Sequence, residues 1–134
     1  MASLDTLFEA AKAIQAKAYA PYSRFKVGAA IATPDGRIFT GCNVENAAYP
    51  VGSCAEAGAI SAMIAGGESR ITEIVVMGDG EHLVTPCGGC RQRIREFAGP
   101  DTPIHIAGPE GIRKRFTLAE LLPFSFGPDN LTDR

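Results

Sequence analysis

The chain has 134 residues, enough for one globular domain with a buried core and too few for two ordinary domains. Its 46% hydrophobic content excludes a disordered chain, and its formal charge of −2 at pH 7 argues against a general phosphate-binding surface. We expect one domain over residues 1–134 that does not bind nucleic acid. The two short basic clusters are expected to be solvated faces, and they are Arg91/Arg93/Arg95 and Arg113/Lys114/Arg115.

The first segment is typical of an amphipathic helix that ends before Pro21. Ser3 is a suitable N-cap, and apolar residues recur at helical spacing at Leu4, Leu7, Phe8, Ala11 and Ile14. Charged residues interrupt the segment, so we expect neither a signal peptide nor a membrane span, and we expect a cytoplasmic protein. In that reducing compartment, four cysteines are better explained as metal ligands or buried thiols than as disulfides.

The segments 25–31 and 37–44 are strand-like and flank Thr33-Pro34-Asp35-Gly36, whose Asp-Gly pair favours a tight turn, so they predict a β-hairpin. Further along, Cys54 precedes a small-residue helix that ends at Gly66-Gly67, and Gly58 within it could permit close packing. The remaining expected elements are a strand over 71–77, a helix from Cys87 to about Phe97, a strand over 103–107 and a short helix over 117–122. This order predicts an α/β fold, a three-layer α/β/α sandwich around a mixed sheet of about five strands.

Two cysteine motifs carry the chemistry. Cys54-Ala55-Glu56 and Pro86-Cys87-Gly88-Gly89-Cys90 each lie where a loop enters an expected helix. Three thiolates can hold one Zn²⁺ and leave a fourth position for water, and the Glu56 carboxylate is placed to handle the protons of that water. Both helix N-termini would stabilise negative charge on the thiolates. The pattern therefore predicts a hydrolytic zinc site with Cys54, Cys87 and Cys90 as ligands.

Two other interpretations are considered. A dithiol redox pair could use Cys87 and Cys90, but it would leave Cys54 and Glu56 without a role. A structural, non-catalytic zinc-binding module would need a fourth ligand, for which Cys42, His82 and His105 are the candidates. We expect Cys42 to be a small buried side chain and both histidines to be surface or core residues, which favours the catalytic site.

The two motifs match the zinc nucleobase deaminase signature, with cysteine as the first ligand. More of the chain resembles the small, homotetrameric cytidine deaminases of the cytidine/deoxycytidylate deaminase family. The segments that carry this resemblance are Pro21-Tyr22-Ser23-Arg24-Phe25-Lys26-Val27-Gly28-Ala29-Ala30, Gly41-Cys42-Asn43-Val44-Glu45-Asn46-Ala47-Ala48-Tyr49, Cys90-Arg91-Gln92 and Leu121-Leu122-Pro123-Phe124-Ser125-Phe126.

The resemblance implies one zinc ion per subunit and hydrolysis of cytidine and 2′-deoxycytidine to the uridines and ammonia, in pyrimidine salvage. Glu56 would pass a proton from the attacking water to N3 and then to the leaving amino group. The resemblance also implies a substrate-binding set, which is Phe25, Asn43, Glu45, Ala47, Tyr49, Ala55 and Phe126. Ala47, Tyr49 and Phe126 would be shared across the subunits of a homotetramer, and the partner would be a free nucleoside. The alternative within this class is a deaminase of another aminopyrimidine nucleoside.

One departure from the family concerns the charge of the zinc site. The family commonly has Arg directly after the catalytic Glu, where it can hydrogen-bond a zinc-bound sulfur, but this chain has Ala57. Compensation for the three thiolates must then come from Arg91, from the helix ends or from another group. Pro50 and Gly58 also depart from the family pattern, so the loop and helix at the first ligand could be built differently.

Overall fold

The computed structural model describes residues 2–132 and is built on a five-stranded mixed sheet with the strand order β2-β1-β3-β4-β5. The pair β3/β4 is parallel, and the other neighbouring pairs are antiparallel. The strands are β1 (Val27–Ala32), β2 (Ile38–Cys42), β3 (Glu73–Gly78), β4 (Pro103–Gly108) and β5 (Gly111–Thr117).

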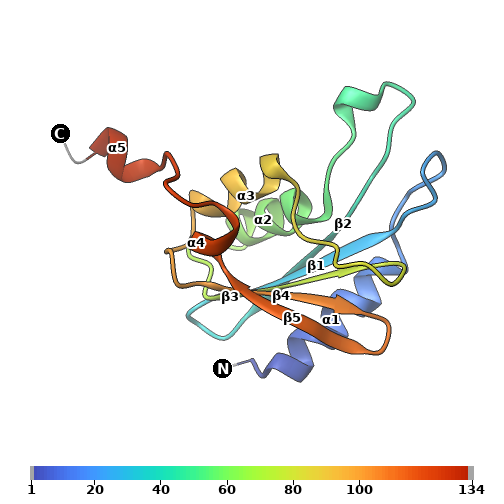
Figure 1. The fold of residues 1–134 in the computed structure, drawn as a ribbon, viewed down its shortest axis with the longest axis horizontal. Coiled ribbons are helices and arrows are strands. Elements are labelled where there is room, and N and C mark those ends of the chain that lie inside the picture. The colour runs from blue at the N-terminus through green and yellow to red at the C-terminus, as the bar shows by residue number, and fades with distance from the viewer. Residues whose placement is uncertain (1, 133–134) are drawn as a thin grey trace.

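Helices cover both faces of this sheet, with α1 on one side and α2 and α3 on the other (Figure 1). The arrangement is the predicted three-layer α/β/α fold. The helical segments are α1 (Leu4–Gln15), the 3-10 turn η1 (Tyr49–Val51), α2 (Ala55–Ala65), α3 (Gly88–Arg95), α4 (Leu118–Leu121) and α5 (Pro128–Thr132). None of the helices in residues 2–132 is long and apolar enough to cross a membrane.

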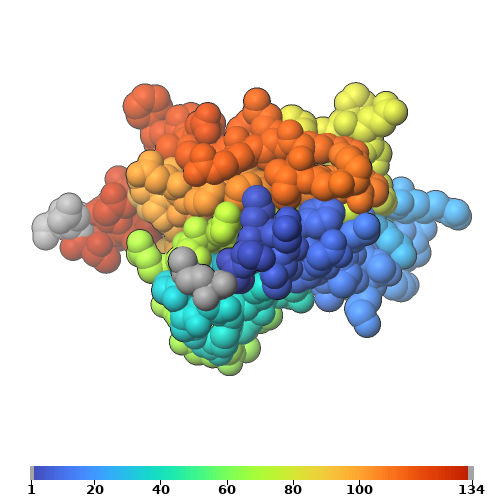
Figure 2. All heavy atoms as spheres, turned by 90° about the horizontal axis from the view of Figure 1, so that it is seen from below, coloured from blue at the N-terminus to red at the C-terminus, as the bar shows by residue number. Residues whose placement is uncertain are grey.

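The helix α1 begins as the sequence predicts. The Ser3 side chain accepts a hydrogen bond from the Thr6 amide at 3.1 Å, which satisfies one of the free N–H groups of the first turn. Leu7 and Ala11 are fully buried against the sheet. Figure 2 shows this face, on which α1 (dark blue) lies between the β5 edge (orange) and the β1–β2 hairpin turn (cyan).

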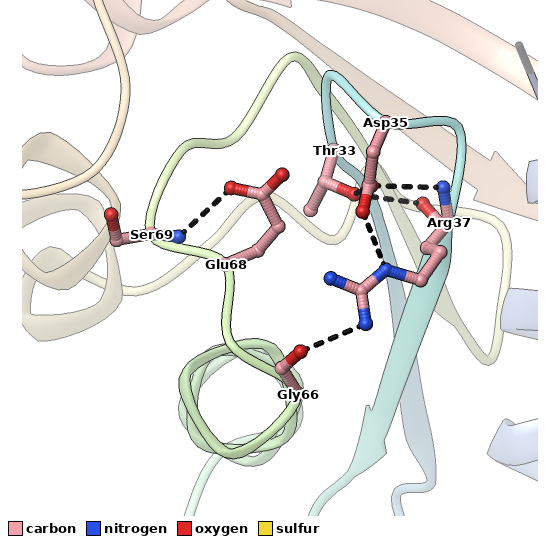
Figure 3. A network of polar contacts seen from close by, with 6 residues as sticks. All are labelled: Thr33, Asp35, Arg37, Gly66, Glu68 and Ser69. Atoms are coloured by element: carbon pink, nitrogen blue, oxygen red, sulfur yellow. Dashed lines mark hydrogen bonds and ion pairs between the residues drawn. The ribbon is translucent and has the colours of Figure 1, made fainter.

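The predicted hairpin is present, and its turn is fixed to α2. Gly36 has a φ of 85°, a conformation that glycine adopts without strain. Arg37 contacts Asp35 at 2.6 Å and donates to the Gly66 carbonyl at the end of α2 at 2.8 Å (Figure 3). This contact ties the C-terminal end of α2 to the hairpin against which the helix packs. It thereby helps to fix the position of the N-terminal end of α2 as well.

A close approach between α2 and β2 depends on Gly41. A Cβ atom at Gly41 would lie 2.3 Å from the Ala59 nitrogen and 2.4 Å from the Ala55 carbonyl oxygen. A Cβ atom at Gly58 would come no closer than 3.5 Å to the nearest backbone atom, which is ordinary contact. Gly58 does face β2, as its predicted packing role requires, but Gly41 sets the separation of the two elements.

The register of the sheet brings the starts of α2 and α3 to one edge. On β1, Val27 pairs with Gly78 at the end of β3, and Gly28 pairs with Cys42 at the end of β2. β2 and β3 therefore end at the same edge, and the chain leaving each of them leads into a helix that begins there. The two cysteine motifs meet because these two helices have neighbouring N-termini.

Three elements were not among the segments expected from the sequence, and they are η1, β5 and α5. The basic run Arg113/Lys114/Arg115 lies in β5, and α5 follows the short helix α4. β5 is an edge strand whose side chains alternate only between partly buried and exposed positions. Its pattern therefore lacks the apolar signal of a strand. Lys114 and Arg115 are exposed, as expected for a solvated face, whereas the Arg113 side chain is only 18% exposed and bonds Glu110 and the His82 carbonyl.

We predict that Gly41→Ala destabilises the fold by about 1–3 kcal/mol, because the added methyl group meets the backbone of α2. Gly99→Ala is the matched control, since a Cβ atom there meets nothing within 4 Å. Chemical denaturation should give a lower midpoint for Gly41→Ala and an unchanged one for Gly99→Ala. Equal midpoints for the two variants would contradict the role of Gly41.

Candidate metal centre and active site

Three cysteines converge where α2 and α3 begin. Cys54 is the N-cap of α2, Cys87 is the N-cap of α3, and Cys90 lies fully buried in the first turn of α3. Their three Sγ atoms lie within 4.8 Å of one another, and those of Cys54 and Cys87 are 3.9 Å apart. Tetrahedral zinc with Zn–S bonds of about 2.3 Å places its sulfur ligands about 3.8 Å apart. The three thiols therefore fit three corners of a zinc site.

No fourth ligand from residues 2–132 completes this cluster. Within residues 2–132, the three cysteines form the only group of His, Cys, Asp or Glu side chains that could hold a metal ion. Cys42 is a free thiol outside it, and the Nε2 atom of His105 is 2.6 Å from a carboxylate oxygen of Glu73. The backbone carbonyl of His82 accepts from Arg113. This arrangement is that of an open site, and it disfavours the closed structural zinc module.

The three thiols differ in exposure, with Cys90 buried, Cys54 half-buried and Cys87 exposed, and ionising all of them together is costly. Burial raises the pKa of Cys54, and burial together with the nearby Glu56 charge raises that of Cys90. Burial acts in the same direction on Cys87, but hydrogen bonds from Cys90 and Cys54 outweigh it and lower the Cys87 pKa. A divalent cation between the sulfurs would favour the charged form of all three.

Glu56 lies in the first turn of α2 and is 4% exposed. Burial raises the pKa of its carboxyl group, and a hydrogen bond from Cys90 and the charge of Arg93 oppose that rise. Glu56 faces a cavity of about 200 Å³, which is lined by Val27, Asn43, Cys54, Ala55, Glu56, Val84, Thr85 and Cys87. The carboxylate and two of the three sulfur ligands therefore border the same small space.

A larger cavity of about 540 Å³ adjoins the first, because Asn43 and Cys54 line both. Its walls come from the loop before β1 and from the segment after β2, and they are Tyr22, Ser23, Asn43, Val44, Glu45, Asn46, Tyr49, Gly52, Ser53 and Cys54. Asn43 and Glu45 face this one space, as their alternation along the end of β2 predicted. The two cavities together offer room for a planar ring near the cysteines and a polar group near Glu45.

Asn43 and Glu45 also hold the loop that borders the cavity. The Asn43 amide accepts from the Val27 N–H and donates to the Phe25 carbonyl, both at 2.8 Å. The Glu45 carboxylate accepts from the Tyr22 and Ser23 amides and from the Ser23 hydroxyl. The Ser23 hydrogen bonds lower the pKa of Glu45, so its carboxylate is ionised at neutral pH.

The arginine that contacts the cysteine cluster is Arg93. Arg91, the expected charge-tuning residue, donates to the Pro86 and Leu121 carbonyls and to the Thr85 hydroxyl. These bonds connect the loop before α3 to the end of α4. The Nη1 atom of Arg93, by contrast, lies 3.4 Å from the Cys90 sulfur. The side-chain contact to a cysteine sulfur is thus made not by Arg91 but by a residue two positions further along the helix.

The remaining candidate residues divide into two groups. Tyr49 and Ala55 line the larger and the smaller cavity, respectively. Phe25, Ala47 and Phe126 are exposed and line neither cavity in this chain.

Sequence reasoning singled out neither Ser23 nor Arg93 for the site. Ser23 lies in one of the segments that carry the family resemblance. Its hydroxyl group, a possible hydrogen-bond donor, was the signal in the sequence that could have pointed to it. Arg93 is three residues after Cys90, the spacing at which helical side chains meet.

Comparison with known proteins agrees with this geometry. Residues 1–106 match the family model described as the cytidine and deoxycytidylate deaminase zinc-binding region. The chain is 38% identical over 129 residues to cytidine deaminase from Sporosarcina psychrophila, covering 96% of this chain and 95% of the relative. It is 40% identical over 124 residues to cytidine deaminase from Halalkalibacterium halodurans, covering 91% and 94% of the two chains.

A solved structure is similar over most of its length. The crystal structure of cytidine deaminase from Burkholderia pseudomallei superimposes with a TM-score of 0.88 at 42% identity, covering 93% of this chain and 100% of that one. The open three-cysteine cluster with a buried glutamate is thus found on the fold of those enzymes. The chain belongs to the cytidine and deoxycytidylate deaminase family of zinc-dependent hydrolytic enzymes.

Proposed function

We propose that this protein hydrolyses cytidine and 2′-deoxycytidine to uridine and 2′-deoxyuridine with release of ammonia. The observation that carries this proposal is the placement of the buried Glu56 and the cysteine cluster in a small cavity that adjoins a larger one lined by Asn43 and Glu45. A pyrimidine ring would occupy the first space and the sugar the second. Pyrimidine salvage in the cytoplasm is the corresponding role, and the four free thiols are compatible with a reducing compartment.

Glu56 would perform the proton transfers. Cys54, Cys87 and Cys90 would hold the zinc ion, which would supply Lewis-acid chemistry that activates water near neutral pH. The Glu56 carboxylate would take a proton from the water that adds to C4 and give it to N3 of the ring. It would then carry the second proton of the same water from the new C4 hydroxyl to the amino group, so that the C4–N bond breaks, ammonia leaves and C4 becomes the carbonyl carbon of uridine. One carboxylate can do both because the water oxygen and the ring edge share its cavity. The burial of Glu56 keeps bulk water away from these transfers.

The other residues of the site would orient the nucleoside. Ala55 begins α2, so its N–H is one of the free donors of the helix N-terminus and can bind an acceptor on the base. Asn43 and the ionised Glu45 can hydrogen-bond ribose hydroxyl groups. A phosphate in place of the 3′-hydroxyl would meet the negative charge of Glu45. This favours a free nucleoside over a nucleic-acid strand.

A homotetramer is part of the proposal. The loop after β2 and the C-terminal segment both project from the body of the fold (Figure 1). They carry aromatic side chains in water, with Tyr49 75% exposed, Phe124 fully exposed and Phe126 59% exposed. Exposed aromatic groups of this kind favour burial in an interface. We infer that Ala47, Tyr49 and Phe126 complete the site of a neighbouring subunit, with Phe25 covering the nucleoside within its own.

The function is tested by Glu56→Gln on cytidine. Removing the carboxylate should lower kcat by at least about a thousandfold, since both proton transfers lose their carrier. Zinc content should stay at one ion per chain, because Glu56 is not among the sulfur ligands. The measurement is loss of cytidine absorbance, with deoxycytidine, cytosine, CMP and adenosine in parallel. Inertness of the native, zinc-loaded protein toward every cytosine compound would refute the proposal.

The sugar-binding role is tested by Glu45→Gln. Loss of a charge-assisted hydrogen bond should raise KM for cytidine about tenfold or more. The effect on KM should be smaller for 2′,3′-dideoxycytidine, which lacks the 2′- and 3′-hydroxyl groups. Ser23→Ala is the matched control, because it loosens the same loop contact and keeps the carboxylate. If Ser23→Ala raised KM for both nucleosides as much as Glu45→Gln did, Glu45 would act only by holding the loop.

The assembly is tested by light scattering on the purified protein. Four chains of 14.1 kDa should give about 56 kDa. Phe126→Ala should raise KM or weaken the assembly without changing the secondary structure, since this ring lies outside the packed core. A monomeric native protein with full activity would contradict the shared site.

A further inference from the structure

We propose that Arg93 is the positioning residue of the zinc centre: its guanidinium holds the Cys90 sulfur and offsets the excess negative charge of three thiolates. Nη1 of Arg93 lies 3.4 Å from the Cys90 Sγ atom. In the part of the chain that the structure describes, this is the one hydrogen bond recorded from a basic side chain to a cysteine sulfur. The inference rests on zinc binding by the cysteines and not on the identity of the nucleoside.

The charge of the cluster creates the need for such a residue. Zn²⁺ with three thiolates has a net charge of −1, and the buried Glu56 carboxylate adds a second negative charge close by. Hydrogen bonds to metal-bound ligands draw electron density away from them and set their orientation. The guanidinium lies 3.4 Å from the Cys90 sulfur, which lies within 4.8 Å of the other two sulfurs, so its positive charge acts on the whole cluster.

The neighbouring side chain leaves room for it. Ala57 and Arg93 line the same hollow of about 380 Å³ between α2 and α3. The methyl group of Ala57 fills little of this space, so the guanidinium of Arg93 can reach across the first turn of α3 to the buried sulfur. A second basic side chain at position 57 would enter the same hollow and repel Arg93. The small residue on α2 and the arginine on α3 are thus complementary.

Other arginines of α3 do not compete for this contact. Arg91 donates to two backbone carbonyls and to Thr85, and Arg95 contacts Ser125 and Asp129 in the C-terminal segment. Arg93 is also the arginine three residues after Cys90, where a helix places two side chains side by side. The spacing and the available partners together assign the sulfur contact to Arg93.

The test is zinc retention, measured as release of zinc to a colorimetric chelator from the full-length protein. Arg93→Gln should release zinc at least about tenfold faster, which is the typical effect of losing a partner of a metal ligand. The double variant Ala57→Arg/Arg93→Gln returns a guanidinium to the same hollow and should recover most of the loss. Arg70→Gln is the control of equal charge change, because Arg70 is exposed beyond the C-terminal end of α2.

A second readout separates the sulfur contact from a general effect on folding. In the cobalt-substituted protein, loss of the hydrogen bond should move the thiolate-to-cobalt charge-transfer band of Arg93→Gln to lower energy, and the double variant should restore it. Unchanged zinc release and an unchanged band in Arg93→Gln would overturn the proposal. Faster release that the double variant does not recover would overturn it too, since the guanidinium would then not be the active group. Neither zinc release nor the cobalt band depends on turnover. A native protein that did not hydrolyse cytidine would therefore contradict the proposed function but not the role of Arg93.

Discussion

The rest of the structure depends on one electrostatic constraint, which is the gathering of three cysteine sulfurs within 4.8 Å of one another beside the buried carboxylate of Glu56. Burial disfavours ionisation of Cys54, Cys90 and Glu56, and neighbouring negative charges, including that of Glu56, disfavour ionisation of the two cysteines further. Such a group is stable only with positive charge at its centre and around its edge. Zinc supplies the positive charge at the centre. The N-termini of α2 and α3, together with Arg93, supply the positive charge around the edge.

The fold meets this constraint through its register and through one close contact. Val27 and Gly28 pair with the last residues of β3 and β2, so both cysteine helices start at one edge of the sheet. Gly41 then lets α2 lie directly on β2, with Ala55 and Ala59 against its backbone. The position of Cys54 therefore depends on a residue outside both cysteine motifs. The cavities beside the cluster follow from the same edge, since Asn43 extends β2 into their walls.

Much of this could be predicted from the sequence because the signals were local. The cap at Ser3, the Asp35-Gly36 turn and the cysteines at two helix starts each indicate structure within a few residues. The alternation of Asn43 and Glu45 along the strand end likewise predicted that they share one face, and both line the larger cavity. β5 was missed because an edge strand with three basic residues needs no apolar alternation.

Arg91 was one candidate for charge compensation, beside the helix ends or another group, because that residue adjoins the third ligand in sequence. In space, Arg91 is used to hold the loop before α3 and the end of α4, and Arg93 faces the sulfur. The residues that we propose to be shared between subunits cannot be derived from the structure of one chain, because Phe126 and Ala47 lie away from its own cavities. The role proposed for them requires the proposed assembly.

X-ray absorption at the zinc edge tests the central claim most directly, because it counts the atoms bound to the metal in the native protein. An open three-thiolate site predicts three sulfur atoms at about 2.3 Å and one oxygen at about 2.0 Å. A shell of four sulfur atoms, or the outer-shell signature of an imidazole ligand, would contradict the account, since the site would then have no position for water.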